Sequence, residues 1–464
     1  MRPVPFISAC FLLVASHLLS APRRTGLDKY VAAPDPSYTW KLSATLPGQQ
    51  RTTYILEMTS QTWKEKDMNR GEWKHWLVIT KPAAMKSDIG YLWITGGAND
   101  GQPRKAADLT LSAMADYTGA VVAELRMVPN QPLSFLADPA RKPRVEDDFI
   151  AYTWNNYLKT GDESWPARMP MTKAAVRAMD TVTAFLATET GGNASVKRFV
   201  VSGASKRGWT TWTTAAVDSR VIAFQPVVID LLNLVPSFIH HYRAYGHWAP
   251  AVGDYFNQGI MDRINDPKFT QLLKLVEPYH YRDRLKQPKF LVNAAGDQFF
   301  LPDSWKFYWK DLLGEKHLRY VPNADHSLRN SDAEQSLTVF FDSVVRGAAR
   351  PEYSWRVTKD NAIEVNCRTK PESVKMWQAT NPNARDFRLQ TLGPAFTSSE
   401  LQPAPGGKYI AKPTAPAKGY TAYFIEMTFP SGGRWPYKFT SGVVVTPDTY
   451  PYPAPIPGKT ALGY

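Results

Sequence analysis

Between residues 89 and 347, short apolar segments typical of buried strands alternate with segments that have the spacing of helices. The strand-type segments cover 89–97, 120–129, 197–205, 221–230, 288–297 and 317–325. The helix-type segments cover 105–118, 145–158, 171–192, 206–217, 304–314 and 331–347. This alternation predicts an α/β fold with a mostly parallel sheet and helices on both faces. Two earlier strand-like segments, 52–63 and 73–82, predict a hairpin ahead of this sheet.

The chain has 464 residues, which is more than one ordinary core accommodates, so we expect more than one domain. We expect an α/β domain over 22–350, with a cap inserted at about 231–286, where aromatic and polar residues mix without a strand pattern. From 351 to 464 the helical spacing stops. Short alternating runs and turn signals such as Ser431-Gly432-Gly433 there predict an all-β sandwich domain.

The N-terminus has the pattern of a signal peptide over 1–21. Arg2 precedes a short apolar run, and small residues follow at Ser20-Ala21. We therefore expect export, to the periplasm or to the medium. No later segment has the length and apolarity of a membrane span, so we expect no stable one. Cleavage would remove Cys10 and leave Cys367 alone, so the mature chain is expected to have no internal disulfide.

The composition and motifs argue against several functional classes. The formal net charge is +13, but the basic residues are scattered and form no dense run, so we expect no nucleic-acid partner. No phosphate loop or dinucleotide fingerprint is present, and we expect no cofactor. His240, His241 and His247 have no carboxylate or cysteine at ligand spacing, so we expect no metal.

The stretch RFVVSGASKRGWTTW at 198–212 carries the chemistry. This stretch has the pattern of a nucleophile elbow, in which a strand leads through Gly203-Ala204-Ser205 into a helix. The serine hydroxyl of such a turn projects above the sheet. The usual second glycine is replaced by Arg207, with Gly208 one residue later. This departure requires the Arg207 side chain to leave the contact between helix and sheet and reach solvent or the site. The alternative interpretation is a strand-end turn without catalytic function.

Two further residues follow Ser205 in the order expected of a Ser-Asp-His triad. Asp297 ends one strand segment and His326 follows the next, about 92 and then about 29 residues on. Ser205 would attack a carbonyl, His326 would move the proton, and Asp297 would orient the imidazole. Asp303 is a rival acid, although we interpret it as the cap of a helix that begins near Ser304. Asp325 adjoins His326, and adjacent loop side chains usually diverge.

An oxyanion hole needs backbone N–H groups close to the serine. We expect one from Lys206 and another from Gly97 or Ala98, in the loop Gly96-Gly97-Ala98-Asn99. The alternative is a plain glycine turn. Lys206 and Arg207 begin a helix, and cations at this end of a helix are unfavourable because they oppose its dipole. Their position is explained if they attract an anionic group of the substrate. The alternative is a solvated helix start without that function. The sequence-based hypothesis therefore assigns substrate contacts to Arg207, Asn99 and His241.

Several long segments resemble, in order, the PhoPQ-activated pathogenicity-related family. They are LRMVPNQPL, EDDFIAYTWNNYL, VSGASKRGWTTW, HHYRAYGHWAP, NAAGDQFFLPDS, YVPNADHSL and MWQATNPNARDFRL. The resemblance implies an exported α/β-hydrolase fold with a triad at Ser205, Asp297 and His326. The resemblance implies no defined substrate. Secreted members of the family act as extracellular signals, and the family is also similar to proteins with dipeptidyl-peptidase folds. The local Gly-X-Ser-Lys also resembles glucuronoyl esterases, which carry a Lys where this chain has Trp209.

These observations lead to two functional hypotheses. The first is an exported serine hydrolase that cleaves an ester or peptide bond through an acyl-enzyme. Its substrate would be a small molecule, a peptide or a glycan ester, with an anionic group favoured. The second is a catalytically weak or inactive protein of the same fold that binds or signals in virulence or stress. The sequence leaves the oligomeric state open.

Overall fold

The computed structural model describes residues 24–99, 101–414 and 416–463. The predicted signal peptide, 1–21, lies outside the described residues. Within the described ranges, no helix is both long and apolar enough to cross a membrane.

A nine-stranded sheet forms the centre of the fold. Its strands are β1 (Thr39–Leu46), β2 (Arg51–Thr62), β3 (Glu72–Pro82), β4 (Ile89–Ile94), β5 (Val122–Leu125), β6 (Arg198–Ala204), β7 (Val221–Val227), β8 (Lys289–Ala294) and β9 (Lys316–Val321). They lie in the order β1-β2-β3-β5-β4-β6-β7-β8-β9. The strands from β5 to β9 in this order are parallel, whereas β1, β2 and β3 pair antiparallel, and so do β3 and β5. The predicted mostly parallel sheet and its initial hairpin are confirmed.

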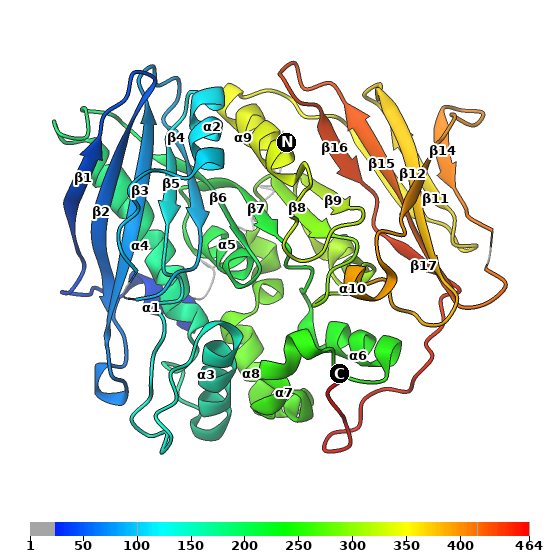
Figure 1. Cartoon of the computed structure of the whole chain (residues 1–464), viewed down its shortest axis with the longest axis horizontal. Coiled ribbons are helices and arrows are strands. Elements are labelled where there is room, and N and C mark those ends of the chain that lie inside the picture. The colour runs from blue at the N-terminus through cyan, green and yellow to red at the C-terminus, as the bar shows by residue number, and fades with distance from the viewer. Residues whose placement is uncertain (1–23, 100, 415, 464) are drawn as a thin grey trace, which may run out of the picture.

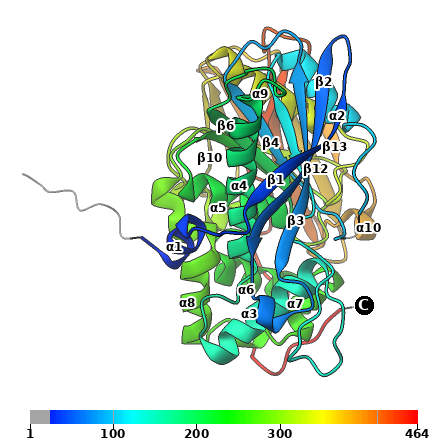
Figure 2. The same ribbon diagram turned by 90° about the vertical axis from the view of Figure 1, so that its left-hand side faces the viewer.

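The helices are α1 (Gly26–Ala32), α2 (Leu109–Thr118), α3 (Glu146–Thr160), α4 (Arg168–Leu186), α5 (Lys206–Val217), α6 (Leu234–Tyr245), α7 (Gly253–Asn257), α8 (Pro267–Val276), α9 (Ala333–Arg346) and α10 (Leu389–Leu392). They cover both faces of the sheet, and Figure 2 shows α4 and α5 on one side and α2 on the other. Alternate strand residues supply the two cores. Leu92 and Val201 join the cluster that contains α4 and α5, whereas Tyr91 and Val200 join the cluster that contains α2 and α9. Strands buried on both faces explain the near-continuous apolar runs in the sequence.

The segment 304–314 is not the helix that its spacing predicts. It forms two short 3-10 turns, Ser304–Phe307 and Trp309–Asp311. Trp305 and Trp309 both pack on Trp355 of the C-terminal part, and the Trp305 indole N–H donates to the Val443 carbonyl. These tertiary contacts outweigh the local preference for a helix.

The C-terminal part contains two antiparallel sheets. Their strands are β10 (Tyr353–Val357), β11 (Ile363–Cys367), β12 (Ser373–Asn381), β13 (Thr397–Glu400), β14 (Lys408–Ala411), β15 (Tyr420–Phe429), β16 (Tyr437–Thr440) and β17 (Val444–Thr446). Val365 and Ile425, one from each sheet, are buried in the same cluster, as a sandwich requires. The sandwich lies beside β9, the last strand of the central sheet, where Thr440 accepts a hydrogen bond from the Tyr320 backbone N–H (Figure 1). This packing covers an edge strand that would otherwise be open.

A helical layer formed by α3, α6, α7 and α8 lies at one end of the central sheet (Figure 1). Helices α6, α7 and α8 come from the insertion between β7 and β8, which is the predicted cap. The segment after β17 returns to this layer, where the backbone of Trp248 pairs with Ala461 and Gly463. The protein thus has an α/β-hydrolase fold with a helical cap and a C-terminal β-sandwich, as predicted.

Candidate active site

Ser205 occupies a sharp turn between β6 and α5. Its φ of 59° and ψ of −124° lie in a region that residues other than glycine rarely adopt. The Ser205 backbone N–H donates to the Val227 carbonyl at 2.8 Å, which fixes the turn against β7. A Cβ at Gly208 would lie 2.8 Å from Ile229 and 3.0 Å from the Gly203 carbonyl. Gly208, rather than position 207, therefore provides the close approach of helix to sheet.

Asp297 and His326 meet beyond the ends of β8 and β9. The Nδ1 atom of His326 lies 2.8 Å from Oδ2 of Asp297. The other Asp297 oxygen accepts the backbone N–H groups of Phe299 and Phe300 at 2.7 and 3.3 Å, so the carboxylate is held in one orientation. These contacts leave the Asp297 carboxylate as the fixed partner of one imidazole nitrogen.

The second imidazole nitrogen, Nε2 of His326, is buried and has no hydrogen-bond partner among the described residues. The ring packs on Phe299 and Phe300, at centroid distances of 4.4 and 5.8 Å, and these two phenylalanines line the same pocket as Ser205. No hydrogen bond joins the Ser205 hydroxyl to His326 within the described part of the chain. Catalytic hydrogen bonds are often long in an enzyme without its substrate.

The two rival acids have other partners. Asp303 is buried and contacts Arg385 at 2.6 Å, His240 at 2.8 Å and Lys306 at 2.8 Å. Burial alone would raise the pKa of Asp303, but these three groups hold it well below its usual range. Its side chain caps no helix, so the capping interpretation was wrong. Asp325 accepts two hydrogen bonds from Ser327.

Lys206 and Arg207 are paired with protein carboxylates. Lys206 Nζ lies 2.8 Å from Glu146 and 3.0 Å from Asp147, and Arg207 donates to both oxygens of Glu146 at 2.6 and 2.7 Å. Burial alone would raise the pKa of Glu146, but the two cations lower it. Arg207 does not line the pocket. The prediction that its charge faces the substrate is therefore corrected: Glu146, some sixty residues earlier, neutralises it.

The loop after β4 lies against Arg207. A Cβ at Gly96 would lie 2.5 Å from the Arg207 guanidinium and would displace it, and Gly97 has a φ of +143°, which favours glycine. Within the described residues, the backbone N–H groups of Gly97, Ala98 and Lys206 have no protein acceptor. The three backbone N–H groups expected for an oxyanion hole are therefore not used in hydrogen bonds within the described protein.

Asn99 does not line the pocket, in contrast to its predicted substrate contact. Its backbone N–H donates to Gln131 and its side-chain amide donates to the Pro132 carbonyl at 3.0 Å. These two bonds fasten the loop to the segment after β5.

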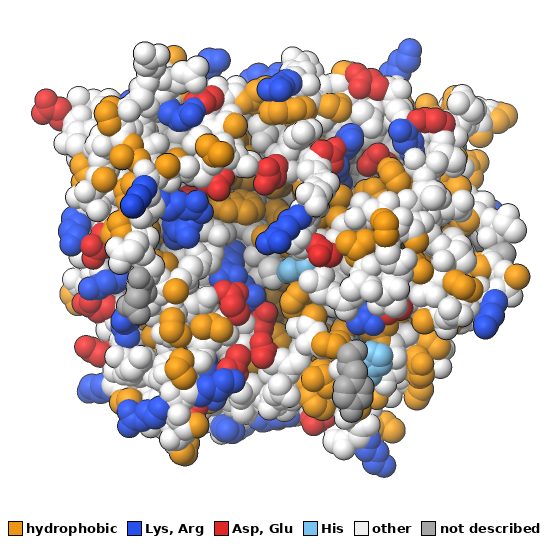
Figure 3. Space-filling model, viewed as in Figure 1, with side chains coloured by type: hydrophobic (Ala, Val, Ile, Leu, Met, Phe, Trp, Pro, Cys, Tyr) orange, Lys and Arg blue, Asp and Glu red, His pale blue; other side chains and the backbone are white. Residues whose placement is uncertain are grey.

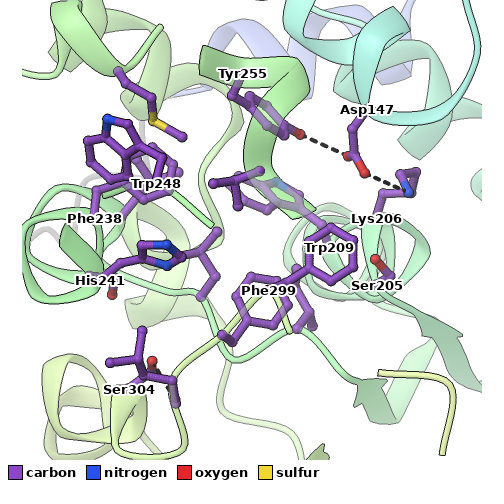
Figure 4. Close-up of a pocket in the computed structure, with 18 of the residues that line it drawn as sticks. Asp147, Ser205, Lys206, Trp209, Phe238, His241, Trp248, Tyr255, Phe299 and Ser304 are labelled. Atoms are coloured by element: carbon purple, nitrogen blue, oxygen red, sulfur yellow. Dashed lines mark hydrogen bonds and ion pairs between the residues drawn. The ribbon is translucent and has the colours of Figure 1, made fainter. Parts of the chain in front are cut away.

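The pocket beside Ser205 is narrow and mostly apolar. Its cavity volume is about 50 Å³. Figure 4 shows Ser205 and Lys206 on one side, and Phe238, His241, Trp248 and Ser304 on the other. The cap thus supplies most of the wall opposite the serine. Figure 3 shows that this face of the molecule is hollowed near its middle, with acidic and basic side chains beside the hollow.

His241 lines the pocket, where its sequence-based assignment placed it. Its Nε2 accepts the Ala249 backbone N–H at 3.0 Å. Burial, with Arg388 nearby, lowers the pKa of His241 to about 3, so the ring is neutral. It offers the pocket an uncharged aromatic surface. His240, by contrast, bonds Asp303 and the Tyr450 hydroxyl, each at 2.8 Å.

The polar residues of the pocket that sequence reasoning missed include Asp147, Arg168 and Tyr255. The Tyr255 hydroxyl donates to Asp147 at 3.1 Å, and Asp147 in turn pairs with Lys206 (Figure 4). Arg168 donates to the Lys206 carbonyl at 2.9 Å. The acidic run at 146–148 was the available signal, because two adjacent buried cations require carboxylates.

Comparison with known proteins gives matches over most of the chain. A family model described as "PhoPQ-activated pathogenicity-related protein" matches residues 27–388. Autocrine proliferation repressor protein A of Dictyostelium discoideum is 37% identical over 475 residues, which cover 96% of this chain and 95% of that protein.

Two of the similar solved structures are acetyl xylan esterases. One, from a Paenibacillus species, has a TM-score of 0.48 and 15% identity, and the match covers 69% of this chain and 91% of that one. The other, from a Thermoanaerobacterium species, has a TM-score of 0.46 and 14% identity, with 67% and 91% covered.

Proposed function

We propose that this chain, which belongs to the PhoPQ-activated pathogenicity-related protein family, is a serine hydrolase. It would cleave an ester or a peptide bond through an acyl-enzyme. The observation that carries the proposal is the pairing of Asp297 with Nδ1 of His326, which leaves Nε2 buried and unpartnered. The same ring packs on Phe299 and Phe300, which line the pocket of the strained Ser205. Strained backbone at a serine is typical of a functional turn.

The proposed reaction has two halves. In the first, the Ser205 hydroxyl attacks the substrate carbonyl while Nε2 of His326 takes its proton, and the imidazolium then gives that proton to the leaving group. In the second, water attacks the acyl-enzyme, His326 takes a proton from the water, and that proton returns to Ser205 as the acid leaves. Asp297 remains ionised, fixes the imidazole tautomer and stabilises the imidazolium.

Backbone donors would stabilise the negative oxygen that forms in each half. Lys206 supplies one N–H at the start of α5, and Gly97 or Ala98 supplies the second from the loop after β4. Each of these groups has no protein acceptor within the described residues. A preorganised donor of this kind contributes about 3 kcal/mol to transition-state stabilisation in serine hydrolases.

A fluorophosphonate probe tests the proposal directly. The Ser205 oxygen would bond to phosphorus and fluoride would leave, so the wild-type protein should be labelled and Ser205→Ala should not. Ser304→Ala is the matched control, because Ser304 lines the same pocket and its hydroxyl donates to the Leu301 carbonyl at 2.7 Å. An unlabelled wild type, or equal labelling of Ser205→Ala, would contradict the proposal.

Export is part of the proposed function and rests on the leader pattern at residues 1–21. N-terminal sequencing of protein recovered from the periplasm or the medium tests it. A chain that begins near Ala21 is the expected result. An intact Met1 in the cytosolic fraction alone would contradict export.

The second candidate function is an extracellular signal with little turnover. Its support is the 37% identity to a protein named an autocrine proliferation repressor. Purified wild-type protein and Ser205→Ala, added to a culture of the source cells, separate the two functions. Equal effects on growth would favour signalling, whereas loss of the effect with the fold retained would favour hydrolysis.

A further inference from the structure

One of the buried cations beside Ser205 has no ion pair of its own. Two buried cations, Lys206 and Arg168, line this end of the pocket, and a third, Arg207, lies behind it. Lys206 and Arg207 form ion pairs with Glu146 and Asp147. Arg168 makes no ion pair with any described carboxylate. The guanidinium of Arg168 thus lies in the wall of the pocket with no described carboxylate within ion-pair distance.

Arg168 is held in place by neutral groups. Its Nη1 donates to the Lys206 carbonyl at 2.9 Å, and its guanidinium lies over the Trp209 ring at 4.4 Å. The Tyr255 hydroxyl, which donates to Asp147, also bonds Arg168. The side chain is 3% exposed, and its Nε has no hydrogen-bond partner among the described residues. Burial lowers the pKa of Arg168, and the nearby Tyr255 and Asp147 offset only part of this effect.

A second donor in the pocket is also unpartnered. The indole Nε1 of Trp154, which lines the pocket, is buried and has no acceptor within the described residues. Indole and guanidinium nitrogens donate but do not accept, so the partner missing from this end of the pocket is an acceptor. An unpaired buried cation is costly, and a carboxylate that accepts hydrogen bonds from a guanidinium removes much of that cost.

We infer that Arg168 recognises a carboxylate on the substrate, within the same pocket that the proposed hydrolase function uses. The carboxylate belongs to the acyl part, because the leaving group must depart toward solvent before water can reach the acyl-enzyme. The walls between Ser205 and the cap are apolar, with Leu231, Phe238 and Trp209 among them, and suit a hydrocarbon segment. The cavity is narrow, so a short hydrocarbon segment is favoured. The substrate class is thus an ester or amide of a short dicarboxylic acid.

Calorimetry on Ser205→Ala tests this inference without turnover. The ligands are monomethyl glutarate, which has a free carboxylate, and dimethyl glutarate, which is similar in size and neutral. We expect the monoester to bind at least about tenfold more tightly, as a charge-assisted contact in a buried site would provide. Equal affinity, or no binding of the monoester, would overturn the inference.

Substitution of Arg168 in the Ser205→Ala background then assigns the preference. Arg168→Gln should abolish it, and Arg168→Lys should retain part of it, because an ammonium keeps the charge but not the planar pair of donors. Arg177→Gln is the control, since Arg177 lies on the same helix and pairs with Asp180 outside the pocket. If Arg168→Gln does not fold, the test rests on Arg168→Lys. If that variant kept the full preference for the monoester, the guanidinium could not be the source of the preference. Probe labelling of Ser205 separately tests hydrolysis, so either proposal can fail alone.

Discussion

The guanidinium of Arg207 makes a two-point ion pair with Glu146 and lies directly behind Gly96. Its Nε also donates to the Val128 carbonyl at 2.5 Å. One side chain therefore links the start of α5, the segment after β5 and the start of α3, and it also packs against the loop after β4. All three segments surround Ser205.

Arg207→Met should destabilise the fold and slow probe labelling. Removing one partner of a buried pair usually costs 3–5 kcal/mol, but Glu146 is partly exposed and keeps Lys206, so we expect about 2 kcal/mol. Urea unfolding measures the change. Arg198→Met is the control, because its ion pair with Asp88 is exposed, and it should cost less than about 0.5 kcal/mol. Equal losses in the two variants would refute a bracing role for Arg207.

Asp297→Asn should slow labelling of Ser205 by at least about a hundredfold, because the amide cannot hold the imidazole in the required tautomer and charge state. Fluorophosphonate labelling rates measure the effect. Asp325→Asn removes a carboxylate adjacent in sequence to His326 and should label at the wild-type rate. The reverse pattern would make Asp325 the acid.

Gly97→Ala should lower kcat far more than it raises KM. The backbone has a φ of +143°, and a Cβ would lie 3.1 Å from Met127, so the loop must shift and misplace its N–H groups. Steady-state kinetics on an activated ester measures both constants. Gly161→Ala also has a positive φ, +76°, with nothing within 4 Å of its Cβ. Both variants should lose about 1 kcal/mol of stability, but only Gly97→Ala should lose activity.

Asp230→Asn should flatten the pH dependence of stability. Burial raises the pKa of Asp230 from 3.8 to about 7, against the hydrogen bonds from Tyr308 and Tyr320. Between these two values the folded protein holds a proton that the unfolded chain has lost. Stability therefore falls as the pH rises through this window, by about 1.4 kcal/mol per pH unit.

Urea unfolding at pH 5 and pH 7 measures this effect in both proteins. The wild type should lose more unfolding free energy than Asp230→Asn over that interval. Parallel losses in the two proteins would show that Asp230 ionises in the folded state as it does in the unfolded chain.

The parallel core was predictable because its signals are local. Strands β6 and β8 are buried along almost their whole length, so each reads as a continuous apolar run ended by a polar residue. Ser205, Asp297 and His326 were found beyond the ends of β6, β8 and β9 for the same reason. Strand β1 was not predicted: it has no fully buried residue, so its sequence has no apolar run.

The electrostatics of the site were less predictable because they depend on distant pairs. Arg207 and Lys206 suggest a free positive patch until Glu146 and Asp147 are placed beside them. Arg168 lies in a stretch with no motif, and only the fold brings it to the helix that follows Ser205. Local sequence indicates the position of a candidate catalytic serine, but not which charged side chains around it lack an ion-pair partner.

The contact between Trp248 and Ala461 has a consequence for the order of folding. The two residues are separated by more than two hundred positions, and the tail reaches the cap only after passing through β17 of the sandwich. The backbone hydrogen bonds that join Trp248 to Ala461 and Gly463 can form only after these residues have been synthesised. Trp248 lines the pocket opposite Ser205, so this part of the pocket wall gains its last backbone bonds only when the end of the chain has emerged from the ribosome.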